Sequence, residues 1–137
     1  MNELAWFVDT GYLVALVSER DELHDRSVEL SKNLQRHLVT TEAVLVEVGN
    51  SLSRPPLRAL ALSLIARLRA NPRIEIVSVD SELFDRALTF YAARPDKDWG
   101  LTDCISFVVM QERGIHEALA ADRDFVQAGF RALLIDK

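Results

Sequence analysis

Two aspartates directly follow short apolar runs that have the length of a buried strand. Asp9 comes after residues 4–8 (LAWFV), and Asp122 comes after residues 118–121 (ALAA). In open parallel sheets, functional groups gather just beyond the carboxyl ends of the strands. If these two strands are neighbours, the two carboxylates lie side by side. Taken singly, each aspartate could equally serve as a turn residue or a helix cap.

Two further acids lie in apolar segments that have helical periodicity. Asp103 opens the stretch DCISFVVM, and Glu47 lies on the flank of an apolar stripe in AVLVEVGNSL. Ser106 follows Asp103 by one helical turn and could line the same cavity. The structural alternatives are complementarity to a helix dipole for Asp103, a solvated side chain for Glu47 and simple space filling for Ser106.

If these acids lie together in the fold, they would favour the binding of a divalent metal ion. Clustered carboxylates repel one another, and unpaired buried carboxylates are costly. Mg²⁺ and Mn²⁺ prefer oxygen ligands, and they are often bound through a few carboxylates together with substrate phosphates. Two such ions ~4 Å apart can activate a water and stabilise the leaving oxygen of a phosphodiester. The acids therefore indicate metal-dependent hydrolysis.

The composition narrows the class of protein. The chain has 137 residues, 49% of them hydrophobic, and a net charge of −5 from 21 acids and 16 bases. Binding of nucleic acid by charge alone is disfavoured at this charge, although five arginines between residues 54 and 73 could contact phosphates or a partner. One cysteine, no signal peptide and no apolar run near ~20 residues favour a cytoplasmic protein without a membrane segment.

The hydrophobic pattern predicts short strands that alternate with helices. Strands are expected at residues 4–8, 37–40, 74–79, 118–121 and 131–135. Helices are expected at residues 12–17, 21–36, 42–52 (capped by Thr41), 57–70, 81–93 (started by Asp80 or Ser81) and 102–113 (closed by Gly114). Because no hairpin signal separates the strands, we expect a single α/β domain over residues 1–137, with a parallel sheet between helices.

Other chemistries fit the first aspartate less well. Asp9-Thr10-Gly11 is the triplet of aspartic proteases, but that fold is nearly all β and this chain is largely helical by periodicity. Haloacid-dehalogenase-like phosphatases require a second aspartate where Gly11 stands. Response-regulator receivers require an acidic pair and a late lysine that are not evident. A degenerate domain that only binds a partner is the non-enzymatic alternative.

Three stretches of the chain resemble the PIN domain, and specifically the VapC-type ribonuclease toxins of type II toxin–antitoxin pairs. They are FVDTGYLVAL, TTEAVLVEVGNSL and DKDWGLTDCISFVVMQERGIHEALAADRDFVQAGF, and together they span nearly the whole chain. The resemblance implies a three-layer α/β/α sandwich around a central parallel sheet. It also implies Mg²⁺- or Mn²⁺-dependent cleavage of RNA, with tRNA and mRNA as candidate substrates, a homodimer, and a cognate antitoxin that blocks the site.

The resemblance also assigns site residues. The family's catalytic acids, which hold the metal, match Asp9, Glu47, Asp103 and Asp122. Thr10 commonly supports the metal site, and Asp124 matches a position that is acidic in part of the family.

The chain departs from the family at two positions. Gly11 and Gly100 stand where the family often has a small hydroxyl residue, and we expect both to alter substrate contacts without removing a metal ligand. The alternatives within the family are a stand-alone PIN nuclease without a toxin role and a catalytically weak PIN-fold binding module.

Overall fold

A computed structural model describes residues 5–32 and 34–135 of the chain. A parallel sheet of five strands lies at its centre, in the order β3-β2-β1-β4-β5. The strands are β1 (Trp6–Val8), β2 (Leu38–Thr41), β3 (Ile74–Val77), β4 (Glu117–Leu119) and β5 (Arg131–Ala132). The predicted α/β class and parallel sheet are therefore confirmed.

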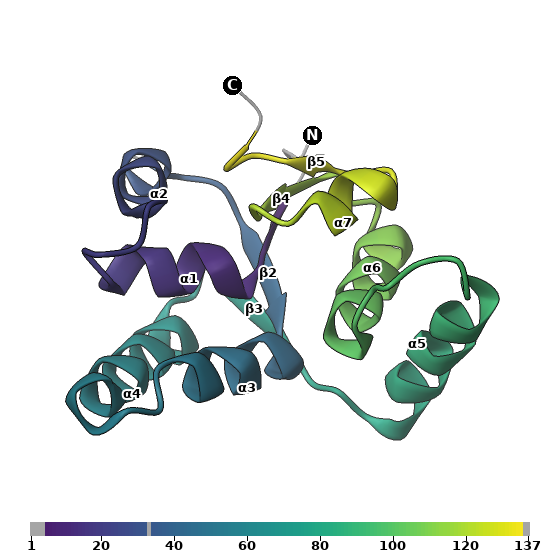
Figure 1. Cartoon of the computed structure of the whole chain (residues 1–137), viewed down its shortest axis with the longest axis horizontal. Coiled ribbons are helices and arrows are strands. Elements are labelled where there is room, and N and C mark those ends of the chain that lie inside the picture. The colour runs from purple at the N-terminus through teal and green to yellow at the C-terminus, as the bar shows by residue number, and fades with distance from the viewer. Residues whose placement is uncertain (1–4, 33, 136–137) are drawn as a thin grey trace.

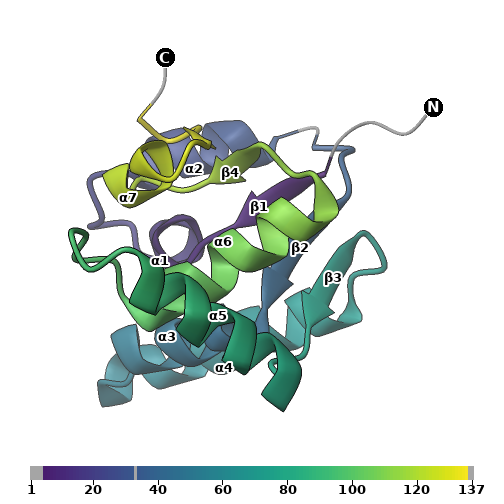
Figure 2. The ribbon, with the colours of Figure 1, turned by 90° about the vertical axis from the view of Figure 1, so that its right-hand side faces the viewer.

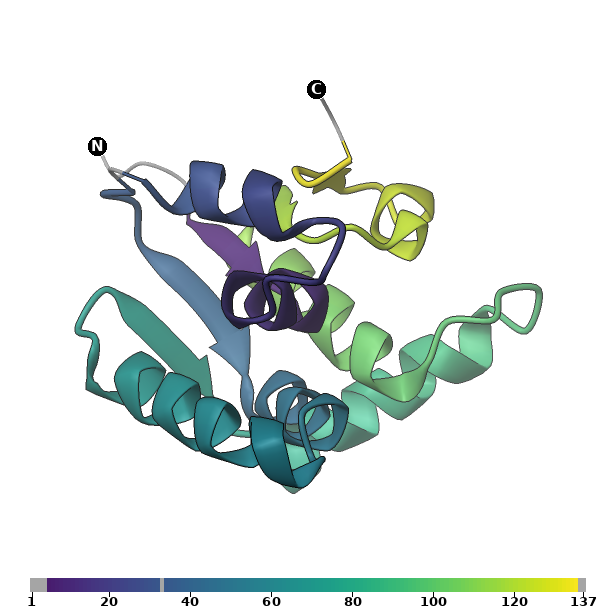
Figure 3. The same ribbon diagram turned by 60° about the vertical axis from the view of Figure 1, so that its left-hand side comes forward.

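Helices cover both faces of this sheet (Figure 1). They are α1 (Thr10–Val17), α2 (His24–Ser31), α3 (Glu42–Ser51), α4 (Pro55–Ala70), α5 (Ser81–Ala93), α6 (Leu101–Arg113) and α7 (Arg123–Gln127). Figure 2 shows α5 and α6 in front of one face, and Figure 3 shows α1, α2 and α4 in front of the other. This arrangement confirms the three-layer sandwich. No helix within residues 5–32 and 34–135 combines the length and apolarity that crossing a membrane requires.

The strand order reverses at β1. The chain places β2 and β3 on one side of β1, and it then crosses back to place β4 and β5 on the other. Phe7 of β1 is accordingly in register with both Val39 of β2 and Ala118 of β4. Such a reversal opens a crevice outside the carboxyl ends of the two strands that flank it. The ends of β1 and β4 are therefore the expected place for a functional site.

An aromatic cluster fixes α6 and α7 against the sheet. The ring of Phe107 packs edge-on against Phe125 of α7 and against Trp99, with centroid separations of 4.9 and 5.2 Å. Phe7 of β1 also contacts Phe125. All residues of α6 from Cys104 to Met110 are buried, since the helix lies between the sheet and α5. These contacts hold α6 against α7.

Helix ends agree with the capping signals. The Thr41 hydroxyl accepts the N–H of Val44 at 3.2 Å, and the Asp80 carboxylate accepts the N–H of Leu83 at 2.9 Å. Gly114 closes α6 with φ of 67°, a left-handed conformation that glycine adopts without strain. These three predicted boundaries are confirmed.

Some predicted boundaries were wrong by a few residues. Helix α4 begins at Pro55, not at residue 57, because proline suits the first helical positions, where a missing N–H costs nothing. Helix α1 begins at Thr10 because Asp9 takes the N-cap position. Helix α2 spans only residues 24–31 of the predicted 21–36, of which residue 33 lies outside the described residues.

The strands and the last helix also differ from expectation. Three strands are shorter than predicted, β3 ending at residue 77, β4 at 119 and β5 at 132. Strand β2 spans residues 38–41, one residue later than expected. Strand β1 begins at Trp6, and residue 4 of the predicted strand lies outside the described residues. Helix α7 was not predicted, because five residues are too few to show a helical period.

Candidate metal centre

Asp9 lies at the junction of β1 and α1. Its backbone is extended, with φ of −102° and ψ of 167°, and its N–H donates to the carbonyl of Leu119 at 3.1 Å. This hydrogen bond ties the end of β1 to the end of β4. The backbone N–H of Thr10 lowers the pKa of the Asp9 carboxyl, and the residue is only 7% exposed. A carboxylate is therefore held in the crevice that the strand reversal opens.

Glu47 reaches the same crevice from α3. This helix starts directly after β2, so its second turn lies beside the start of α1. The Thr10 hydroxyl donates to Oε1 of Glu47 at 2.8 Å. That hydrogen bond orients the Glu47 carboxylate and joins α1 to α3.

Asp103, Asp122 and Asp124 form the tightest group of acids. Each offers one carboxylate oxygen, and these oxygens lie within 4.8 Å of one another. Asp103 comes from the first turn of α6, Asp122 caps α7, and Asp124 lies in the first turn of α7. The Asp124 N–H donates to Oδ1 of Asp122 at 2.8 Å. The predicted strand-end and helix-opening aspartates thus lie together.

The pKa values of two aspartates show how closely the acids interact. Burial is the main cause that raises the pKa of Asp103 to about 8, and the charges of Asp9, Asp122, Asp124 and Glu47 add to it. Burial likewise raises the pKa of Asp9 to about 7, against the lowering effect of the Thr10 N–H. We call these five residues, Asp9, Glu47, Asp103, Asp122 and Asp124, the acidic cluster.

The acidic cluster fits a hard divalent cation. All its donors are carboxylate oxygens, which Mg²⁺, Mn²⁺ and Ca²⁺ prefer. Each side-chain charge that shifts the pKa of Asp9 or Asp103 belongs to another carboxylate. Within residues 5–32 and 34–135, no cation therefore offsets the repulsion at these two groups. Carboxylates that converge without a protein counter-charge are costly, and a bound cation removes that cost.

The remaining predicted site residues lie around the acidic cluster. Ser106 is fully buried, and its hydroxyl donates to the carbonyl of Thr102 at 3.1 Å, which ties it to the backbone of α6. A Cβ atom at Gly11 or at Gly100 would meet nothing within 4 Å beyond its chain neighbours and the adjacent helix backbone. The small hydroxyl residues that the family resemblance leads us to expect at these two positions would therefore fit this backbone.

One acid near the cluster was not singled out in the sequence. The charge of Asp98 raises the pKa of Asp124, after the larger effects of burial and Asp122. Asp98 belongs to the loop before α6, which is held against α7 because the ring nitrogen of Trp99 donates to Gln127 at 3.1 Å. Since this proximity depends on a tertiary contact, no spacing in the sequence could have indicated it. Trp99 itself packs in the core.

Known proteins resemble the chain over most of its length. The family described as PIN domain matches residues 6–131. Two curated relatives, both named 23S rRNA-specific endonuclease VapC20, come from the Mycobacterium tuberculosis strains CDC 1551 / Oshkosh and ATCC 25618 / H37Rv. Each is 32% identical over 125 residues, which cover 90% of this chain and 94% of the relative.

A solved structure has a similar fold. The crystal structure of Mycobacterium tuberculosis VapC20, described as a Sarcin-Ricin loop cleaving toxin, superimposes with a TM-score of 0.84 at 28% identity. The match covers 92% of this chain and 96% of that one. The similarity therefore extends to the strands and helices that carry the acidic cluster.

Proposed function

The chain belongs to the PIN domain family, and from this premise we propose that it is a divalent-metal-dependent endoribonuclease. The observation that carries the proposal is the convergence of five carboxylates at the carboxyl ends of β1 and β4. Among the described residues, no cation contributes to the charges that act on Asp9 and Asp103. The names of both curated relatives, which describe RNA endonucleases, support the same reaction.

The acidic cluster supplies the proposed metal ligands. Asp9, Glu47, Asp103 and Asp122 are the catalytic residues that would hold Mg²⁺ or Mn²⁺, and Asp124 is an auxiliary ligand. When bound, the metal would activate a water and stabilise the leaving oxygen of the phosphodiester. Thr10 holds Glu47 in position through its hydroxyl. Since Asp9 and Asp103 have raised pKa values, metal binding must displace protons from them.

The substrate and partners are proposed from the relatives. Because both curated relatives are named for 23S rRNA, that RNA is the first substrate to test, with tRNA and mRNA as alternatives. The toxin description of the solved relative supports a toxin role, and a toxin requires a cognate antitoxin. We further propose a single PIN domain over residues 1–137, a homodimer and a cytoplasmic site of action, where the RNA is found.

Cleavage of RNA with and without a chelator tests this function. We expect purified protein to cleave total RNA in Mg²⁺ or Mn²⁺, and we expect EDTA or Asp9→Asn to abolish cleavage. Sequencing of the cleavage ends identifies the RNA. Cleavage that survives the chelator or the substitution would overturn the proposal. Expression of the wild type and of Asp9→Asn in bacteria tests toxicity, because growth arrest by the wild type alone supports a toxin.

A further inference from the structure

Four arginines of the described residues form ion pairs with carboxylates. The ion pairs are Arg86–Glu112, Arg94–Asp96, Arg113–Glu75 and Arg131–Glu117. Residues 54–73 differ, because this segment carries five arginines and no acid. Within it, Arg58 and Arg73 donate only to backbone carbonyls, those of Ser53 and Gln35.

Five exposed arginines have no hydrogen-bond or ion-pair partner within residues 5–32 and 34–135. They are Arg20, Arg54, Arg67, Arg69 and Arg123. An unpaired arginine on the surface can bind an anion without first losing an internal contact. Its guanidinium group also matches the geometry of a phosphate. These residues are therefore candidates to bind an anionic ligand.

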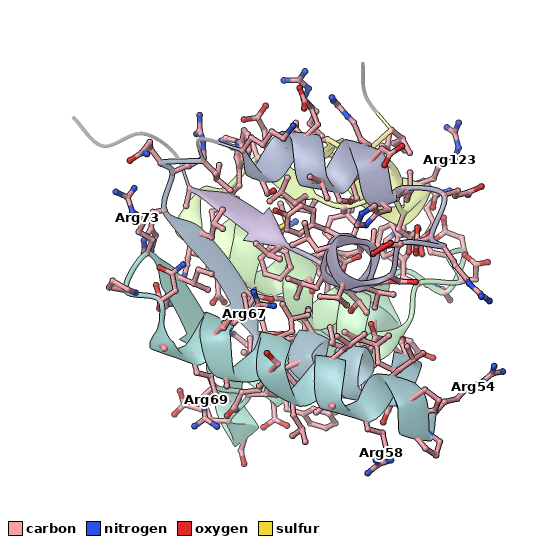
Figure 4. The ribbon with its side chains drawn as sticks, turned by 90° about the vertical axis from the view of Figure 1, so that its left-hand side faces the viewer. Arg54, Arg58, Arg67, Arg69, Arg73 and Arg123 are labelled. Carbon is pink, nitrogen blue, oxygen red and sulfur yellow. The ribbon has the colours of Figure 1, made fainter. Side chains whose placement is uncertain are left out.

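Arg54 and Arg123 lie at the end of the molecule that carries the acidic cluster. In Figure 4, the strand β1 points to the right, and Arg54 and Arg123 both extend at that side, one below and one above. Arg123 directly follows Asp122, and Arg54 caps the start of α4, three residues after α3, the helix of Glu47. Arg69 lies toward the opposite end of α4.

The two arginines flank the crevice from opposite directions. Figure 1 places α7 and the connection between α3 and α4 on opposite sides of β1, in agreement with Figure 4. A strand that crossed the acidic cluster from one of these elements to the other would meet one arginine before the carboxylates and one after them.

We propose that Arg54 and Arg123 are positioning residues that bind backbone phosphates of the RNA on either side of the scissile phosphate. This inference rests on the proposed endonuclease function. The acidic cluster and the net charge of −5 repel an RNA strand, so local positive charge must hold the strand on both sides of the cut. An acidic protein partner is the competing occupant, but it would not require arginines that flank the crevice.

Single substitutions with a matched control test the inference. The variants are Arg54→Gln and Arg123→Gln, and the control is Arg69→Gln, an exposed and unpartnered arginine of α4 at the far end. Cleavage of a fluorescent single-stranded RNA of about 12 nucleotides, the size of a single-strand binding site, is measured in Mn²⁺. Binding of the same RNA is measured on the Asp9→Asn background at several salt concentrations.

We expect each of the two substitutions to raise KM roughly fivefold, and the double variant to raise it roughly 25-fold, because distant contacts add. We expect kcat to change less than twofold. The slope of log affinity against log salt should fall by about 0.7 for each lost phosphate contact. Arg69→Gln should match the wild type in all three quantities.

The outcomes separate this inference from the proposed function. If the wild type cleaves RNA but Arg54→Gln and Arg123→Gln retain its KM and salt slope, the inference is overturned. The two arginines would then be assigned to binding of an acidic protein partner. An equal effect of Arg69→Gln also overturns the inference. RNA binding would then depend on the total positive charge of the protein and not on where the arginines lie. If the wild type shows no metal-dependent cleavage, the proposed function fails first. Circular dichroism melting checks that each variant is folded.

Discussion

A single hydroxyl group connects two members of the site that are far apart in the chain. The Thr10 hydroxyl donates to Glu47, which otherwise lies half-buried on the flank of α3. A glutamate side chain has several rotatable bonds, and a fixed hydrogen bond restricts them before a metal arrives. Thr10 thus supports the arrangement of acids without being a ligand itself.

The raised pKa of Asp103 makes the stability of the metal-free protein depend on pH. The native state keeps protons on Asp9 and Asp103 up to about pH 7 and 8, whereas the unfolded chain loses them near pH 4. Because the native state binds more protons in this window, stability falls as pH rises from about 4 to 8.

We therefore expect Asp103→Asn to stabilise the protein at pH 8 in EDTA and to have little effect at pH 4. The gain should be about 1 kcal/mol, or roughly 4 °C in Tm, after allowance for the partial exposure of Asp103. Thermal melts of both proteins from pH 4 to 9 measure it. A gain that does not change with pH would contradict this assignment.

The helix α6 carries Asp103 on an otherwise buried segment, so packing decides where this carboxylate lies. Phe107, one turn further along the helix, contacts both Trp99 and Phe125, and through Phe125 it reaches the helix of Asp122 and Asp124. The aromatic contacts thus couple the element that carries one acid to the element that carries two others.

Removal of this ring should therefore destabilise the fold and loosen the site together. We expect Phe107→Ala to lower the free energy of unfolding by about 3–5 kcal/mol, the usual effect of deleting a buried phenylalanine. Phe84→Ala on α5, at a position that is 39% exposed, is the control and should cost about 1 kcal/mol or less. Urea denaturation measures both, and equal losses would contradict the role given to Phe107.

The order of the strands brings the acids together across the whole molecule. Asp9 and Asp122 are separated by more than a hundred residues, yet the N–H of Asp9 is bonded to the end of β4. Glu47 reaches the same crevice from α3, which follows β2, and Asp103 reaches it from α6, which precedes β4. Because four separate segments contribute carboxylates, a bound metal would link most of the fold.

Metal binding should accordingly stabilise the entire protein. At pH 8 we expect Mn²⁺ at 100 times its Kd to stabilise the wild type by about 2.7 kcal/mol. Asp9→Asn should lose most of this gain, while Glu29→Gln, an exposed α2 acid paired with Lys32, should retain it. Differential scanning calorimetry measures the shift, and an equal response from Asp9→Asn would exclude Asp9 as a ligand.

The sequence by itself determined the local features of this protein. The apolar runs that end at Asp9 and Asp122, the buried helix that Asp103 opens and the signals at Thr41 and Gly114 were readable, because propensity, periodicity and capping act over a few residues. These features, with the resemblance to the PIN domain, were enough to predict the fold class and to select the acids.

Only the tertiary structure decided which of these features meet. The position of β4 beside β1, the hydrogen bond between Thr10 and Glu47, the approach of Asp98 to Asp124 and the short helix α7 depend on contacts between distant segments. Such contacts form where the whole chain buries its apolar faces, so no local pattern encodes them. Likewise, the proposal that Arg54 and Arg123 bind RNA phosphates was possible only because the fold shows that both lie beside the crevice.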